Sequence, residues 1–82
     1  MSPEATDETA DGKAAVDKLV YMANQIGKFF AHEGAERAPA SIADHLRRFW
    51  DPRMRTRIVR HLRAGGTGFD PFVREAVELL AR

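Results

Sequence analysis

The sequence contains no cysteine, one tryptophan, one tyrosine and no long run of apolar residues. Without cysteine, the chain can form no disulfide, offer no thiolate to a metal and carry out no thiol catalysis. No apolar run approaches the ~20 residues that a membrane-spanning helix needs, and the N-terminus lacks a basic segment followed by an apolar one. We therefore expect a soluble cytoplasmic protein that makes no membrane contact.

The chain is also short, with 82 residues, and can form one domain at most. Residues 1–12 are polar and acidic, so we expect a disordered tail there and a single helical domain over residues 13–82. A core of this size supplies only ~3–5 kcal/mol of net stability. Because no disulfide can add to that, a partner protein is the expected source of further stability.

Charge is distributed unevenly along the chain, although the net charge is only +1. The first twelve residues hold four acids and no base, so the rest of the chain is basic. Residues 45–63 contain seven arginines and a single acid, Asp51. Such a patch attracts nucleic acid, an anionic ligand or an acidic protein surface, and charge alone does not choose among them.

Apolar residues recur at helical spacing, and no segment alternates as a half-buried strand does. The first helix is expected to begin at Lys13 and to stop at Gly34, with residues 35–40 linking it to the next helix. Ser41 followed by Asp44 resembles a capping box, so the second helix should begin at Ser41.

The apolar stripe of the first helix is too wide for a single contact. Most of its apolar residues follow three-and-four spacing, but Met22, Ile26 and Phe29 widen the stripe beyond one face. This pattern predicts two separate contacts for the first helix.

Asp-Pro dipeptides at 51–52 and 70–71 predict the starts of two further helices. The Asp oxygen can accept from the free N–H groups of the first turn, and Pro at the first helical position loses no hydrogen bond. The third helix should end at Gly65-Gly66. The predicted fold is therefore all-α: a small domain of about four short helices with a disordered N-terminal tail.

Candidate catalytic and metal-binding groups are scattered along the chain. His32, His45 and His61 fall on different predicted elements, so we expect no metal site. The acids fall at helix starts and on exposed faces rather than as a pair in a pocket, so we expect no enzyme activity. Residues 65–68 are rich in glycine but lack the Lys and Ser or Thr that continue a phosphate loop, and we interpret them as a turn.

Residues 49–55 are the most informative stretch, because they combine the single tryptophan, a helix start and arginines. Aromatic residues beside arginine are typical of interface hot spots. In so small a domain, one of Phe49 and Trp50 should face the core and the other a partner, and the sequence does not say which. The arginines of the third helix fit a solvated face, a protein contact or the phosphate-facing side of a DNA-recognition helix.

Several motifs in fixed order carry a family resemblance. They are LVYMANQIGKFF at 19–30, IADHL at 42–46 and FWDPRMR at 49–55, followed by His61, Gly65-Gly66 and FDPFV at 69–73. Over residues 18–80 the chain resembles the delta subunit of soluble NAD-dependent formate dehydrogenases.

The resemblance implies an accessory subunit of a cytoplasmic complex. In such a complex the alpha subunit holds a molybdenum or tungsten bis-pterin cofactor and iron-sulfur clusters, and it oxidises formate to CO2. Electrons then pass to NAD through the other subunits. The delta chain would be non-catalytic, would hold no cofactor or metal, and would bind the alpha subunit to stabilise it or to help it mature.

We expect the contact with the alpha subunit to involve the aromatic and arginine corner together with the outer side of the first helix. The predicted contact residues are Asn24, Gln25, His45, Arg47, Arg48, Phe49, Trp50, Asp51, Pro52, Arg53, Met54 and Arg55. Two alternatives stay open from the residues. One is a small basic module that binds nucleic acid through the third helix, which we rank below the protein contact. The other is a transient chaperone that binds the anionic pterin through arginine side chains.

Overall fold

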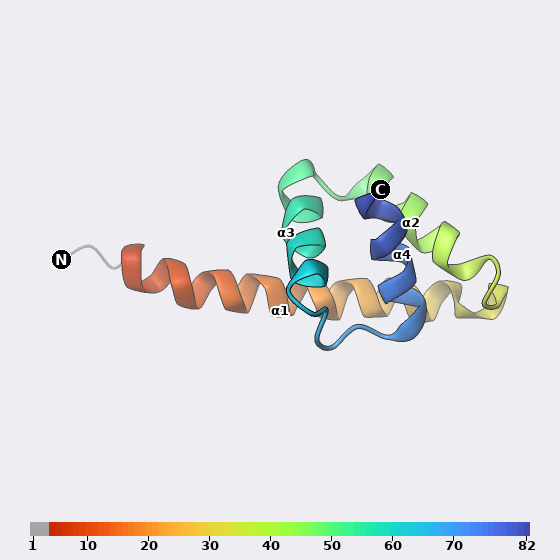
Figure 1. Cartoon of the computed structure of the whole chain (residues 1–82), viewed down its shortest axis with the longest axis horizontal. Helices are drawn as coiled ribbons and strands as arrows, with labels where there is room; N and C mark the ends of the chain where they lie inside the picture. The colour runs from red at the N-terminus through yellow and green to blue at the C-terminus, as the bar shows by residue number, and fades with distance from the viewer. Residues whose placement is uncertain (1–3) are drawn as a thin grey trace.

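The computed structural model describes the backbone of residues 4–82, the surroundings of Gly12 and the side chains of residues 14–82. The elements are α1 (Glu4–Phe30), the 3-10 turn η1 (Ala31–Glu33), α2 (Ala38–Phe49), α3 (Pro52–Arg63) and α4 (Pro71–Ala81), as Figure 1 shows. No strand occurs within residues 4–82. The prediction of an all-α fold with four helices is confirmed.

Helix α1 begins at Glu4 rather than at the predicted Lys13. Residues 1–3, and the side chains of residues 4–11 and 13, lie outside the described residues. The predicted tail over 1–12, and its separation from a domain over 13–82, therefore stay predictions.

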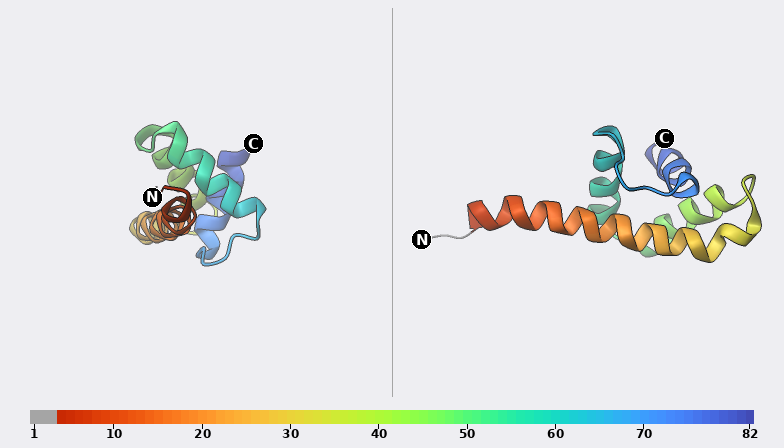
Figure 2. Two further views of the ribbon diagram at one scale, coloured as in Figure 1. Left: turned by 90° about the vertical axis from the view of Figure 1, so that its left-hand side faces the viewer. Right: turned by 90° about the horizontal axis from the view of Figure 1, so that it is seen from below.

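Helices α2, α3 and α4 pack along the C-terminal part of α1, and the N-terminal part of α1 projects past them (Figures 1 and 2). The most extensive helix contact is between α2 and α4. One cluster of buried apolar side chains joins all four helices, and no polar or charged side chain is buried among the described residues. The largest fully buried side chains are Ile42, Leu46, Ile58, Val73 and Val77.

Gly27 lets α1 approach α4 closely. A Cβ atom at this position would lie 2.5 Å from Cγ2 of Val73 and 3.7 Å from Cδ1 of Ile42. Both of these neighbours are fully buried and cannot move into solvent. The absent side chain of Gly27 is therefore a packing requirement of the core, and not a sign of backbone flexibility.

The two ends of α3 follow the sequence prediction. Asp51 Oδ1 accepts the backbone N–H of Met54 at 2.9 Å, which caps the first turn. At the other end, the N–H of Gly66 donates to the carbonyl of His61 at 2.9 Å, and the N–H of Gly65 donates to that of Leu62 at 3.0 Å. This is a Schellman motif, and the positive φ of 126° at Gly65 explains why glycine stands there.

The predicted start of α2 is wrong. The helix begins at Ala38, and Ser41 lies inside its first turns, where its Oγ donates to a carboxylate oxygen of Glu33 in η1. Ala38 and Pro39 belong to the buried part of the protein, so the predicted linker over 35–40 extends too far. Proline is tolerated in the first turn of a helix because the N–H it lacks has no partner there.

The predicted cap at Asp70 is wrong in its chemistry. Asp70 is the N-cap residue of α4, but its side chain accepts no capping hydrogen bond. Its backbone N–H donates to Oδ1 of Asn24 at 3.0 Å, which is a separate hydrogen bond from the missing cap. The loop before α4 is thus tied to α1 by a side chain that the local sequence around Asp70 does not reveal.

The structure separates the two adjacent aromatic residues at the end of α2. Trp50 is 6% exposed and lies in the core, whereas Phe49 is 71% exposed. The backbone at Trp50 is extended (φ −90°, ψ 139°), which ends α2 and directs consecutive side chains to opposite sides. The expectation that one of the pair faces inward is confirmed, and Trp50 is that residue.

We expect Gly27→Ala to lower the free energy of unfolding. Overpacking of this kind costs roughly 1–3 kcal/mol, which should exceed the ~1 kcal/mol that alanine contributes through helix propensity. Gly12→Ala is the matched control, because it lies in the same helix and a Cβ there meets no atom within 4 Å. Chemical denaturation should show destabilisation for the first variant alone. Equal stabilisation of both would contradict the close packing.

We expect Trp50→Ala to unfold the isolated chain or to destabilise it by about 3–5 kcal/mol, as removal of a buried tryptophan does. Phe49→Ala should change the free energy of unfolding little, since its side chain is exposed. Thermal unfolding followed by circular dichroism compares the two. Similar losses from both variants would show that Phe49 also supports the core.

Candidate functional site

Four aromatic rings form a continuous strip across the outer surfaces of α1 and α2. We call Phe29, Phe30, His45 and Phe49 the aromatic strip. The ring centroids of Phe29 and Phe30 are 5.1 Å apart, those of Phe30 and His45 are 5.9 Å apart, and those of His45 and Phe49 are 4.7 Å apart. The first two pairs meet edge to face, an arrangement that the ring quadrupoles favour.

The two ends of the aromatic strip are open to solvent. Phe29 is 72% exposed and Phe49 is 71% exposed, while Phe30 and His45 between them are half-buried. Large aromatic side chains left in water forgo the free energy of burial, and contiguous exposed apolar surface is typical of interaction sites. The strip is therefore the strongest candidate on this molecule for a protein contact.

Only part of the aromatic strip was predicted from the sequence. His45 and Phe49 are among the predicted contact residues, but Phe29 and Phe30 are not. The signal was present, since the apolar stripe on α1 is wider than one contact needs and Phe29 lies at its margin. The sequence does not show how α2 packs against α1, and this packing brings the ring of His45 against that of Phe30.

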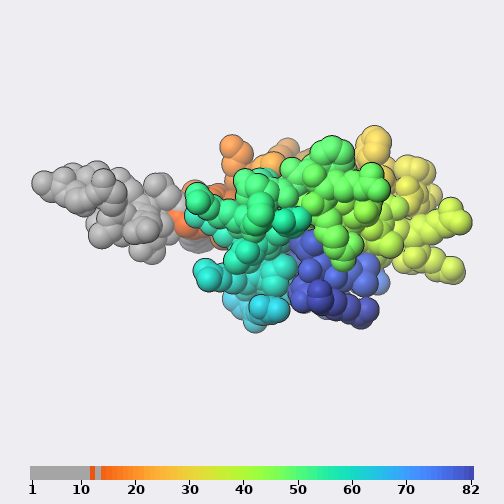
Figure 3. Space-filling view, turned by 90° about the horizontal axis from the view of Figure 1, so that it is seen from above, coloured from red at the N-terminus to blue at the C-terminus, as the bar shows by residue number. Residues whose placement is uncertain are grey.

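Arginines from α2 and α3 line a second feature, which we call the arginine groove. It is a groove of about 560 Å³ that α4 also borders. Figure 3 shows the face on which α2, α3 and α4 meet. The groove is lined by Arg47, Arg55, Thr56, Val59, Arg60, Arg63, Leu80 and Ala81.

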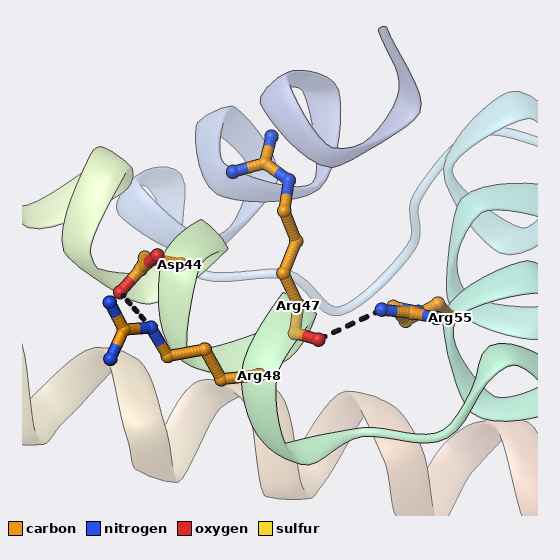
Figure 4. Close-up of polar contacts among 4 residues, drawn as sticks. All are labelled: Asp44, Arg47, Arg48 and Arg55. Atoms are coloured by element: carbon orange, nitrogen blue, oxygen red, sulfur yellow. Dashed lines mark hydrogen bonds and ion pairs between the residues drawn. The ribbon is translucent and has the colours of Figure 1, made fainter.

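Two of these arginines are held by backbone carbonyl groups. Nη1 of Arg55 donates to the carbonyl oxygen of Arg47 at 2.8 Å, as Figure 4 shows. Nη2 of Arg47 donates to the carbonyl oxygen of Leu79 at 3.2 Å. Both acceptors lie in the last turn of a helix, where carbonyl groups lack a partner within the helix. The two arginines therefore also stabilise the ends of α2 and α4.

The remaining predicted contact residues of the corner have local roles or stand apart. Nε of Arg48 pairs with Oδ2 of Asp44 at 3.1 Å, an exposed ion pair that contributes little stability. Pro52 opens α3, and Met54 packs against the core. Arg53 is exposed on α3 outside the arginine groove. The predicted corner is thus divided between the aromatic strip, the core, the arginine groove and exposed positions outside all three.

Asn24 is engaged within the chain, unlike its neighbour Gln25. Nδ2 of Asn24 donates to the carbonyl oxygen of Gly68 at 2.9 Å, and its Oδ1 accepts the N–H of Asp70 at 3.0 Å. One side chain on α1 thereby holds both ends of the segment that leads into α4. Gln25 is exposed.

The three histidines do not converge. Nδ1 of His32 lies 3.0 Å from the carbonyl oxygen of Phe29, and Nε2 of His61 lies 2.7 Å from that of Thr67. Across the described residues, no three His, Asp or Glu side chains gather into a group that could hold a metal ion. In the same part of the chain, no helix combines the length and the apolar character that crossing a membrane requires.

Comparison with known families places these surfaces in context. Residues 18–77 match the family described as NADH-dependent formate dehydrogenase delta subunit, FdsD. The chain belongs to this family. No curated protein and no solved structure matches the chain. The resemblance to formate dehydrogenase delta subunits noted from the motifs is confirmed.

The matched region of this delta subunit covers the whole aromatic strip and most of the arginine groove. Only Leu80 and Ala81, at the end of α4, lie beyond the matched residues 18–77. Both surfaces therefore arise mainly from the part of the chain that the delta-subunit family shares.

We expect Asn24→Ala to lower the free energy of unfolding by about 1–2 kcal/mol, because the N–H of Asp70 and the carbonyl of Gly68 both lose their partner. Gln25→Ala on the same helix should change it by less than about 0.5 kcal/mol. Urea denaturation of the two variants measures the difference. If Asn24→Ala is as stable as Gln25→Ala, the two hydrogen bonds do not hold the segment before α4.

Proposed function

We propose that this delta subunit is a non-catalytic accessory component of a soluble, cytoplasmic formate dehydrogenase complex. In this proposal it binds the catalytic alpha subunit and stabilises it or helps it mature. Formate oxidation at the molybdenum or tungsten pterin cofactor, and transfer of electrons to NAD, belong to the other subunits. Family membership supports the complex, and the exposed aromatic strip is the observation that supports a binding role.

The aromatic strip has the properties of a hot spot for protein binding. Each aromatic side chain can bury on the order of 150–250 Å² against a partner. Because neighbouring rings of the strip already contact one another, their rotamers are restricted, and less side-chain entropy is lost when a partner covers them. An apolar groove or pocket on the alpha subunit is the complementary surface that this strip requires.

The small core gives a thermodynamic reason for the association. A domain of this length has only ~3–5 kcal/mol of stability from its own packing. Any partner that binds the folded chain alone increases its apparent stability by mass action. By the same linkage, the delta subunit stabilises whichever conformation of the alpha subunit exposes the matching surface.

The use of the acidic residues supports a non-catalytic role. A catalytic acid or base is usually partly buried and has a perturbed environment. Asp51 instead caps α3, and Asp44 pairs with Arg48 in solvent. Both carboxylates therefore have structural roles, and neither role involves a reaction.

We expect the double variant Phe29→Ala/Phe49→Ala to lose the alpha subunit. Truncation of two hot-spot aromatics should weaken binding by about 2 kcal/mol or more, which is roughly thirtyfold. Co-expression with the other subunits, followed by tagged purification at moderately high salt, measures the retained alpha subunit. Formate-dependent NAD reduction by the purified material measures whether the delta subunit matters for activity.

Tyr21→Ala is the matched control, because Tyr21 is 65% exposed on α1 and makes no ring contact with the aromatic strip. Thermal unfolding of each free variant separates loss of binding from loss of folding. If the folded double variant retains the alpha subunit, the aromatic strip is not the docking surface. Purification of the wild-type chain alone, with unaffected activity, would refute the accessory role itself.

A further inference from the structure

We propose that the arginine groove is a second docking surface, and that it binds an acidic segment of a protein partner that also carries apolar side chains. The groove shares no residue with the aromatic strip. This inference therefore stands on its own observations and does not depend on the strip being the contact for the alpha subunit.

The charge of the groove is entirely of one sign. Four guanidinium groups line it, from Arg47, Arg55, Arg60 and Arg63, and none of its lining residues is acidic. Within the described part of the chain, the Arg60 and Arg63 side chains have no hydrogen bond or ion pair and are exposed. Like charges gathered around one depression create a positive potential that a partner of opposite charge reduces.

Part of the groove is already organised for binding carboxylates. The guanidinium groups of Arg47 and Arg55 each use a donor on a backbone carbonyl, at 3.2 Å and 2.8 Å respectively. A guanidinium has five N–H donors, so the others stay available. In Figure 4 the Arg47 side chain extends from α2 toward α4, and Arg55 faces the end of α2. Side chains held in this way lose less conformational entropy when their guanidinium groups bind the two oxygens of a carboxylate.

The apolar residues of the groove distinguish a protein segment from other anions. Val59 of α3 and Leu80 and Ala81 of α4 line the groove together with the arginines, and all three are half-buried. A phosphate backbone or a free inorganic anion gains nothing from contact with these side chains. A segment that alternates acidic and apolar residues satisfies both the charges and the apolar lining. The composition of the groove therefore favours an acidic protein segment over nucleic acid.

The test uses the full chain and two fluorescein-labelled synthetic peptides. The Glu-Leu peptide contains glutamate and leucine, and in the Glu-Ser peptide serine replaces each leucine. Fluorescence polarisation measures binding at low and at physiological salt. We expect the Glu-Leu peptide to bind with an affinity that decreases as salt rises, because the charges are screened. The Glu-Ser peptide should bind at least about fivefold more weakly, since it cannot use the apolar lining.

Two double variants on the same helix form the matched pair. Arg60→Gln/Arg63→Gln removes two charges from the groove. It should weaken binding of the Glu-Leu peptide about tenfold, or 1.4 kcal/mol. Arg53→Gln/Arg57→Gln removes the same charge from exposed positions of α3 outside the groove and should leave affinity within about twofold once long-range charge is screened. Circular dichroism confirms that both variants stay folded.

Three results would overturn the proposal. The first is no binding of the Glu-Leu peptide by the wild-type chain. The second is equal loss of affinity in the two double variants, which would show that net charge, and not the position of the arginines in the groove, determines binding. The third is tighter binding of duplex DNA or inorganic pyrophosphate than of the Glu-Leu peptide, which would make the groove a site for phosphates. None of these results bears on the aromatic strip, whose test uses different residues and a different readout.

Discussion

Trp50 lies at the junction of α2 and α3 with 6% of its surface exposed, and its burial governs where the neighbouring side chains go. The extended backbone at this residue ends α2 and leads into the Asp51 cap of α3. Since Trp50 must face the core, Phe49 has to point to solvent. Arg47, on another side of the same helix end, reaches α4. One buried ring thus determines which surface receives the aromatic residue and which receives the arginine.

In the proposed docking roles, the two surfaces suit different parts of a binding process. Burial of aromatic rings is short-ranged and contributes mainly to affinity, so it controls how slowly a complex dissociates. The charge of the arginine groove acts over a longer distance and contributes mainly to the rate of encounter and to specificity. Neither surface requires a polar side chain to be buried inside the chain, and none is buried among the described residues.

Helix ends marked by local chemistry were predicted well, and ends decided by distant contacts were not. Asp51 followed by Pro52 carries its own capping chemistry, so the start of α3 was read from the sequence. At Asp70 the same dipeptide starts a helix, but its side chain accepts no first-turn N–H, and a distant residue, Asn24 on α1, accepts the backbone N–H of Asp70 itself. Ser41 was misassigned since Glu33 provides its partner and burial of Ala38 against the other helices draws α2 to an earlier start.

The sequence by itself determined the helical fold class, the family and the presence of aromatic and arginine residues in one region, because periodicity, capping residues and ordered motifs are local properties. It also predicted that one of Phe49 and Trp50 faces the core and the other does not. Tertiary structure alone decided that the buried one is Trp50 and that Phe29 and Phe49 belong to one strip across two helices. It also decided that Arg60 and Arg63 line one groove with Leu80 and Ala81. These outcomes depend on how helices far apart in the chain pack together, and no local pattern encodes that packing.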